Sequence, residues 1–320
     1  MNNTLQPKVG VITINFNQID YTLDCIESIL KSDYYNYEVL LVDNGSTVEN
    51  FKSLTDRLPR DNKINILKLQ TNIGYTGGVN HALKQANEID CDYFLIMNND
   101  TLIDQNAIKE LVITSEKYKG EAIVSGKTYN YNKKKSLQYI GQKHNPKDIL
   151  NQLPYVKNRD EEDLGQYDRE IEMGMLDDIF WIFSAQIYKN VGQYSDYFFL
   201  YGEQNDFAFR ALKKGFKLIY THKAKIWHKG SITTANGDSK SPKIYYWNVF
   251  ATFKLATLHL SKNKYKRFYM NFTVRNYMKH FLLILINKSN FKYLKAFHLA
   301  RKNFKHWNKI RYIDNGYNPF

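Results

Sequence analysis

The chain has 320 residues, 43% of them hydrophobic, and a formal net charge of +13. This length and composition argue against disorder and fit one large domain, or a domain of roughly 200 to 250 residues with an appendage. Two cysteines are too few for a disulfide framework or a cysteine metal site. We therefore expect Cys25 and Cys91 to be reduced core thiols in a cytoplasmic protein.

No segment predicts secretion or a membrane span. The N-terminal residues do not lead from a charged segment into an apolar stretch, so no signal peptide is visible. The longest fully apolar run near the C-terminus, residues 281–286, is far shorter than the ~20 residues needed to cross a bilayer.

The basic excess lies in the last quarter of the chain. Residues 239–320 hold 17 Lys and Arg and 1 acidic residue, whereas residues 1–238 hold 28 and 31. Aromatic residues alternate with the lysines there. Such a segment binds an anionic membrane surface or nucleic acid, or it forms a solvated helical face, and the sequence distinguishes these alternatives poorly.

Strands and helices alternate through residues 1–120. Apolar β-branched runs predict strands, and apolar residues at helical spacing predict helices. The predicted strands are 8–16, 37–42, 64–69 and 93–97, and the predicted helices are 21–30 and 75–86. Strands that alternate with helices imply right-handed parallel crossovers, so this part reads as a Rossmann-like α/β half.

The periodic pattern weakens after residue 127. We expect a long loop or irregular strands over 127–169, and a flexible connection over 233–242 that leads to aromatic, basic helices. Between them, ordered structure is predicted over 176–188, a helix over 206–214, and short strands over 216–220 and 224–227.

Two predicted strands end on carboxylates. The fourth strand ends on Asn98-Asn99-Asp100, at an edge where open α/β sheets bind ligands. Asp100 is placed to hold a divalent cation against a phosphate, and an Asx turn is the alternative. Asp43 follows the second strand with a glycine turn behind it, and it suits a base or ribose, although Asp-Asn-Gly is also ordinary turn chemistry.

A glycine-rich segment opens the second predicted helix. In residues 72–78, Gly77 and Gly78 would let backbone N–H groups approach a diphosphate closely. The segment has neither the Gly-x-Gly-x-x-Gly spacing of a dinucleotide loop nor the Lys-Ser/Thr pair of a Walker loop. A purely structural turn is an equal alternative.

Taken together, six segments in this order resemble family 2 glycosyltransferases of the GT-A fold, especially the bacterial rhamnosyltransferase-like branch that builds surface polysaccharides. The segments are 11–17, 41–47, 72–78, 97–101, 198–206 with Arg210, and 227–231. The resemblance runs from residue 9 to about residue 231. It implies a GT-A catalytic domain over residues 1–232, with a donor-binding half (1–120) and an acceptor half (121–232), followed by a basic, aromatic-rich helical region (233–320).

The resemblance implies an inverting transfer of a sugar from a nucleotide-diphosphate donor, dTDP-rhamnose or a UDP-hexose, to a hydroxyl of a saccharide or lipid-linked saccharide. The donor-binding residues that it implies are Thr13, Asn15, Asp43, Asn72, Gly77, Gly78, Asn98, Asn99 and Asp100. Asn98 replaces the first acid of the family's Asp-x-Asp element. Asp100 is then the main carboxylate ligand of Mn²⁺ or Mg²⁺, with His228 as a further ligand; a histidine bonded at a strand end is its alternative.

The family's base lies in a Glu-Asp-x-Asp or Glu-Glu-x-Asp element, and here Glu203, Gln204 and Asp206 occupy it. Gln204 stands at the usual base position, where an amide cannot accept the proton. Three explanations stay open. Glu203 or Asp206 serves instead, Gln204 is an engineered replacement of Glu, or the chain binds nucleotide sugars or carbohydrates without transferring them.

The acceptor-binding candidates are Trp181, Tyr201 and Arg210. Aromatic faces stack on sugar rings, although most aromatic residues near this element are expected in the core. The basic region 239–320 is expected to hold the enzyme on the inner face of the cytoplasmic membrane. Nucleic acid is disfavoured as a partner because residues 1–238 are net acidic and contain no recognisable nucleic-acid module.

Overall fold

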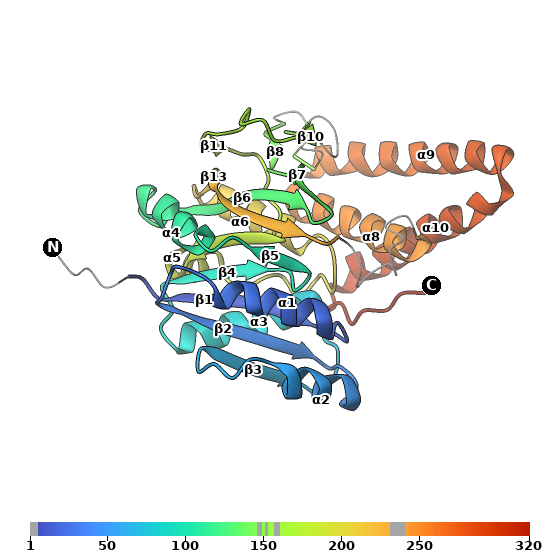
Figure 1. Cartoon of the computed structure of the whole chain (residues 1–320). Coiled ribbons are helices and arrows are strands. Elements are labelled where there is room, and N and C mark those ends of the chain that lie inside the picture. Colours follow the sequence, from blue (N-terminus) through green and yellow to red (C-terminus); the bar gives the residue numbers. More distant parts are fainter. Residues whose placement is uncertain (1–5, 146–148, 151–152, 157–160, 231–240) are drawn as a thin grey trace. The chain divides into compact units, whose positions relative to one another are not determined.

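The computed structural model describes residues 6–145, 149–150, 153–156, 161–230 and 241–320 (Figure 1). Contacts within the chain group it into two compact units. The first comprises Met1–Tyr194 and Arg210–Gly230, and the second comprises Ser195–Phe209 and Ser231–Phe320. Residues 233–240 of the predicted flexible connection (233–242) lie outside the described residues.

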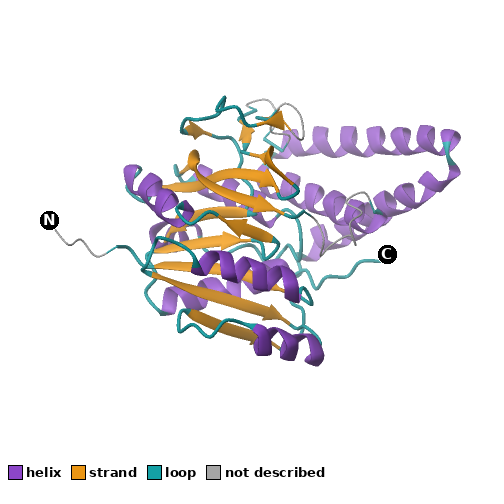
Figure 2. Ribbon diagram, in the orientation of Figure 1, coloured by secondary structure: helices purple, strands orange, loops and turns teal. Residues whose placement is uncertain are grey.

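A mixed β-sheet with helices on both faces forms the first unit (Figure 2). Its strands are β1 (Val9–Asn15), β2 (Tyr37–Asn44), β3 (Ile64–Leu69), β4 (Tyr93–Met97), β5 (Thr101–Ile103), β6 (Ala122–Asn130), β7 (Lys133–Tyr139), β10 (Glu161–Glu162), β11 (Ile171–Glu172), β12 (Phe180–Ser184) and β13 (Lys217–His228). Strands β8 (Gln142–Lys143) and β9 (Leu153–Pro154) form a separate pair.

The helices of this unit are α1 (Ile19–Leu30), α2 (Val48–Arg57), α3 (Gly74–Glu88), α4 (Ala107–Lys117) and α5 (Ala185–Val191); α6 (Glu203–Lys213) begins in the second unit and ends in the first. Side-chain alternation along β1 decides which helix each residue meets. Val9 and Val11 join the core cluster that contains α1 and α4. Gly10 faces α3 instead, where an added Cβ would lie 3.1 Å from Ala86.

The predicted α/β fold is confirmed in the first half. Strand β1 pairs in parallel with β2 and with β4, and β2 pairs in parallel with β3. The element bounds predicted over residues 1–120 agree with the structure to within about two residues. Parallel pairing brings the carboxyl ends of these strands to one edge of the sheet.

The second half needs one correction, and the first half one addition. Of the two alternatives expected over 127–169, the described residues show irregular strands: β6 continues to Asn130, and β7 pairs with it antiparallel with shifts in register. The two short strands predicted over 216–227 are one strand, β13, with an irregularity between Tyr220 and Lys225. In the first half, helices α2 and α4 are present although the sequence reading did not identify them.

The second unit is built from helices. They are α8 (Pro242–His259), α9 (Lys262–Ile286), a 3₁₀ turn (Lys288–Asn290) and α10 (Phe291–Ile310). Ser241 caps α8 by accepting a hydrogen bond from the Ile244 N–H at 3.3 Å. The core is aromatic, and Phe253 stacks on Phe304 within it at a centroid distance of 4.9 Å.

One charged pair is buried in the second unit. Lys254 Nζ donates to Asp314 Oδ2 and to the Tyr197 carbonyl, each at 2.5 Å. Burial lowers the pKa of Lys254 to about 8, against the opposing effect of Asp314.

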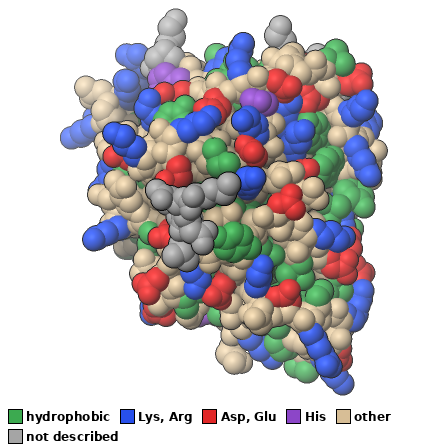
Figure 3. Space-filling view, turned by 60° about the vertical axis from the view of Figure 1, so that its left-hand side comes forward, with side chains coloured by type: hydrophobic (Ala, Val, Ile, Leu, Met, Phe, Trp, Pro, Cys, Tyr) green, Lys and Arg blue, Asp and Glu red, His purple; other side chains and the backbone are tan. Residues whose placement is uncertain are grey.

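The described helices contain no stretch long and apolar enough to span a bilayer. On the face drawn in Figure 3, acidic and basic side chains are intermixed.

Candidate functional site

A chain of polar side chains connects the carboxyl ends of β1, β2 and β4. Asn15 and Asp43 are register partners, and Asn15 Nδ2 donates to Asp43 Oδ1 at 2.8 Å. Thr22 Oγ1 donates to Asn15 Oδ1 at 3.0 Å, and Asn99 Nδ2 donates to Thr22 Oγ1 at 2.9 Å. The structure thus brings together three of the predicted donor residues. Thr22, which bridges them, was not predicted.

These strand-end residues are enclosed. Thr13, Asn15 and Asp43 are each 0% exposed. Asp43 Oδ2 also accepts the Ser46 N–H at 3.2 Å, which is the turn hydrogen bond that the Asp-Asn-Gly sequence indicated as an alternative. In the described conformation these residues support the strand ends, and the atoms around Asp43 must move before a ligand can reach it.

The glycine segment belongs to helix α3 rather than to the loop before it. The helix begins at Gly74, so Gly77 and Gly78 lie in its first turns. Asn72 Oδ1 accepts the Gly74 N–H at 2.8 Å and so fixes the helix start. A Cβ on Gly78 would lie 3.3 Å from the Ile14 side chain, so this glycine permits close packing of α3 on β1. Its packing role is therefore observed.

Asp100 and His228 form a buried pair. Asp100 lies in the turn between β4 and β5, and the antiparallel pairing of β5 with β13 sets His228 opposite Thr101. His228 Nε2 is 3.2 Å from Asp100 Oδ1, and the two residues are 7% and 5% exposed. The Lys229 N–H donates to the Asp100 carbonyl at 2.9 Å, which holds the end of β13 against this turn.

Gln138 orients the imidazole of His228. Its Oε1 lies 2.9 Å from His228 Nδ1. An amide oxygen only accepts hydrogen bonds, so Nδ1 carries the proton and Nε2 is directed at Asp100. With a cation bound beside Asp100, Nε2 would be the nitrogen that ligates it, and Gln138 would support the ring from Nδ1. Gln138 was missed because it lies within the region 127–169, which was expected to be a long loop or irregular strands and in which no residue was singled out.

The Asp100–His228 pair fits a divalent cation that is shared with a ligand. Among the residues that the structure describes, no group of three or more His, Cys, Asp or Glu is placed to hold a metal. A carboxylate with an imidazole suits Mn²⁺, and two protein ligands leave most coordination positions for phosphate oxygens and water.

Two further carboxyl groups precede β12. Asp178 is 5% exposed and accepts the Tyr194 hydroxyl at 3.0 Å. Burial, and next the neighbouring Asp177, raises the pKa of Asp178 above its usual range. Burial also raises the pKa of Asp177, against the opposing effects of the Ile179 N–H and His228. The sequence reading did not single out either residue.

The predicted base element opens helix α6. Glu203 and Asp206 are each 3% exposed, and Gln204 is half-buried. Asp206 Oδ1 is 2.8 Å from Nε2 of His259, the last residue of α8. The ring of His259 also packs against Phe209 at a centroid distance of 5.1 Å. These residues belong to the second unit, whereas Asp100 and His228 belong to the first.

The predicted acceptor residues make packing contacts. Trp181 is 0% exposed in β12 and meets Tyr194 edge to face at 6.4 Å. Tyr201 is half-buried against the aromatic core of the second unit. Arg210 donates from Nη1 to the Val191 carbonyl at 2.6 Å and from Nη2 to the Gln193 carbonyl at 2.8 Å. Arg210 therefore secures the chain that follows α5.

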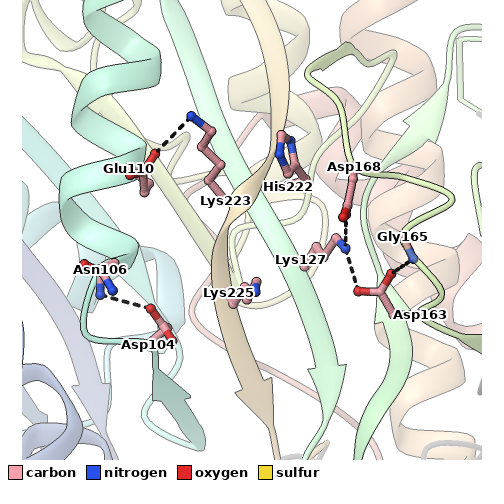
Figure 4. Close-up of a pocket in the computed structure, with 10 residues that line it drawn as sticks. All are labelled: Asp104, Asn106, Glu110, Lys127, Asp163, Gly165, Asp168, His222, Lys223 and Lys225. Atoms are coloured by element: carbon pink, nitrogen blue, oxygen red, sulfur yellow. Dashed lines mark hydrogen bonds and ion pairs between the residues drawn. The ribbon is translucent and has the colours of Figure 1, made fainter.

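A separate polar pocket of about 580 Å³ lies along β13 (Figure 4). Lys127 Nζ pairs there with Asp163 at 2.5 Å and with Asp168 at 2.6 Å, and Lys223 lies 4.0 Å from Glu110. The described residues that line this pocket include none of the predicted donor or metal residues. It is distinct from the strand-end site.

Comparison with known proteins identifies the family. The model of glycosyl transferase family 2 matches residues 10–192. GlyG of Streptococcus pneumoniae serotype 4, a glycosyltransferase, is 28% identical over 123 residues, which are 38% of this chain and 40% of GlyG. TuaG of Bacillus subtilis, a putative teichuronic acid biosynthesis glycosyltransferase, is 32% identical over 81 residues, 25% of this chain and 32% of TuaG. The chain thus matches less than half the length of either relative.

The solved structure of GalNAc-T7 with UDP, GalNAc and Mn²⁺ has a similar fold. The TM-score is 0.61 at 13% identity, over 82% of this chain and 50% of that one. The mixed sheet of the first unit is therefore that of the GT-A fold. The chain belongs to glycosyl transferase family 2.

Proposed function

We propose that this glycosyltransferase moves a sugar, with inversion, from dTDP-rhamnose or a UDP-hexose to a hydroxyl of a saccharide or lipid-linked saccharide in surface polysaccharide biosynthesis. The observation that carries the proposal is the buried Asp100–His228 pair beside the polar chain at the carboxyl ends of the strands. The similarity to TuaG supports the polysaccharide assignment. The rhamnosyltransferase-like branch stays a prediction.

In this proposal residues 1–232 form the catalytic domain, with the donor bound by residues 1–120 and the acceptor by residues 121–232. Asp100 and His228 would hold Mn²⁺ or Mg²⁺, which when bound neutralises the departing nucleotide diphosphate. Gln138 keeps His228 Nε2 directed at Asp100. The first turn of α3 would offer phosphate its backbone N–H groups other than that of Gly74, which donates to Asn72.

Asp43, Asn15 and Thr13 would form the floor of the nucleotide site. Asp43 retains unused lone pairs beside its bonds to Asn15 and Ser46, so it can accept hydrogen bonds from a base. Because Asp43 is fully buried, we expect donor binding to displace the atoms that cover it.

Donor binding tests this proposal directly. With Mn²⁺ present, the correct nucleotide sugar from a panel is expected to stabilise the protein by about 2.7 kcal/mol at a hundred times its dissociation constant. Asp100→Asn should abolish both this stabilisation and transfer while leaving the ligand-free melting temperature unchanged. Asp56→Asn is the matched control, because Asp56 is an exposed carboxylate on α2. A normal donor response in Asp100→Asn would contradict the assignment.

The proton acceptor is a second part of the proposal. Because the chain belongs to glycosyl transferase family 2 and Asp100, Asp43, Arg210 and His228 all match its pattern, we favour the first two explanations for Gln204: Glu203 or Asp206 takes the proton of the acceptor hydroxyl, or Gln204 replaces an acid. Removal of the true base by Glu203→Gln or Asp206→Asn should lower kcat by about 100-fold or more while donor binding persists. Gln204→Glu should raise kcat if position 204 held the base, and an unchanged rate would count against that position.

We also propose that residues 239–320 hold the enzyme on the inner face of the cytoplasmic membrane, where lipid-linked acceptors lie. Their 17 basic residues and 1 acidic residue support an anionic partner.

A further inference from the structure

Helix α9 has two apolar faces, and one of them packs inside the second unit. Phe272 meets Phe253 of α8 at a centroid distance of 5.2 Å. Tyr277 meets Phe297 of α10 at 5.1 Å. These rings belong to the aromatic core, so this face of α9 is accounted for by folding.

The other apolar face of α9 is exposed. Its residues recur at intervals of three and four positions, which places them along one side of the helix. They are Met270 (63% exposed), Val274 (48%), Met278 (61%), Phe281 (61%) and Leu285 (70%). We call these five residues the α9 stripe. Leu282 and Ile286 extend it at the C-terminal end and are 57% and 83% exposed. An apolar surface of this length is costly in water and indicates a binding surface.

The charges around the α9 stripe decide what covers it. The helix carries exposed Arg267, Arg275 and Lys279, and the chain has no acidic residue between Asp238 and Asp314. A second copy of α9 would bring the same cations together without counter-charges. Nucleic acid would pair with the cations but leave the mostly aliphatic stripe in water. An anionic lipid surface offers phosphates to the cations and acyl chains to the stripe.

We propose that α9 lies flat on an anionic lipid surface, with the α9 stripe inserted among the acyl chains and with Arg275 and Lys279 at the level of the phosphates. The helix is about 38 Å long, so it offers a long contact parallel to the surface. This inference rests on the membrane partner proposed above and specifies insertion of named side chains, not electrostatic adsorption alone.

The first test is flotation of the full chain with vesicles of phosphatidylcholine containing about 30% phosphatidylglycerol. The variant Met278→Gln, Phe281→Gln, Leu285→Gln replaces three of the five stripe residues. It leaves the charge unchanged and introduces a residue that favours helix. This variant should bind the vesicles at least about tenfold more weakly than the wild type does. The matched control is Val48→Gln, Ile113→Gln, Leu164→Gln, which changes exposed apolar residues of the first unit and should bind as the wild type does.

The second test measures insertion. Phe281→Trp places an indole in the stripe, and lipids brominated along the acyl chains should quench its fluorescence beyond the background of the 4 native tryptophans. Tyr35→Trp, at an exposed position of the first unit, should show no added quenching.

Several outcomes would overturn the proposal. The proposal is wrong if the wild type does not float with the vesicles, or if the stripe variant floats as well as the wild type. It is also wrong if Arg275→Gln, Lys279→Gln abolishes flotation while Phe281→Trp shows no quenching, because binding would then be electrostatic adsorption without insertion. Conversion of a dimer to a monomer by the stripe variant, with flotation unchanged, would instead assign the stripe to a second copy. Two variants distinguish failure of this proposal from failure of the proposed activity. The stripe variant, if correctly folded, should keep its donor-dependent stabilisation. Asp100→Asn should float with the vesicles as the wild type does.

Discussion

At the scale of single residues, the Asp100–His228 pair depends on a side chain that takes no direct part in it. Gln138 Oε1 fixes which nitrogen of His228 carries the proton, at 2.9 Å from Nδ1. Without that acceptor, the imidazole is free to rotate or to present its other nitrogen to Asp100.

Gln138→Ala is therefore expected to weaken Mn²⁺ binding by about 10- to 100-fold. The measurement is the Mn²⁺ concentration needed for half-maximal donor-dependent stabilisation. Gln138→Glu, which keeps an acceptor, should restore most of the affinity. Gln186→Ala, on the exposed face of α5, is the control. An unchanged Mn²⁺ titration in Gln138→Ala would show that this hydrogen bond only supports the fold.

The two thiols make a second prediction at this scale. Cys25 and Cys91 are buried, and burial raises the pKa of each thiol to about 12. Because the thiolate is the reactive form, neither should react with a disulfide reagent at pH 8 in the native protein. Both should react in denaturant. A fast-reacting thiol in the native state would contradict the burial.

At the scale of elements, fully buried strands were the most predictable. Strand β4 is buried at every position, so its sequence is a continuous apolar run. Strand β7 was missed because its first three residues, Lys133, Lys134 and Lys135, are exposed and basic. The exposed half of such a strand has no apolar signal, and only its hydrogen bonds to β6 reveal it.

The irregularity in β13 gives a prediction about packing. A Cβ on Gly126 of β6 would lie 2.2 Å from the Ala224 carbonyl oxygen, because β13 shifts register between Tyr220 and Lys225. Gly126→Ala should cost about 1 to 3 kcal/mol, since backbone must move to make room. Gly10→Ala, whose Cβ would meet Ala86 at 3.1 Å, should cost less. Urea unfolding measures both, and equal costs would contradict the argument.

At the scale of the whole molecule, the two units should respond differently to alkaline pH. In the first unit, the thiol pKa values rise from 9.0 to about 12 on folding. The native state then keeps protons that the unfolded chain loses, so stability falls as pH rises above about 9.

In the second unit, Lys254 has the opposite sign. Its pKa falls from 10.5 to about 8, so the unfolded chain binds more protons between these values and stability rises there with pH. Hydrogen exchange at pH 8 and pH 10, corrected for intrinsic rates, should show lower protection in β1 and unchanged or higher protection in α8. A change of protection in the same direction in β1 and α8 would contradict the opposite signs of the thiol and Lys254 pKa shifts.

The sequence by itself determined the α/β class, the four parallel strands of the first half, the basic C-terminal quarter, and Asp43, Asp100 and His228 as site candidates. These features are local, because the burial of a strand determines the composition of that strand and each short motif is contiguous in the chain. Only the tertiary structure decided the distance and burial of the Asp100–His228 pair, the contacts of Gln138 and Thr22, and the grouping of residues 195–209 with the C-terminal helices. Each depends on which segments distant in the chain pair or pack together, and on their register, which no local pattern encodes.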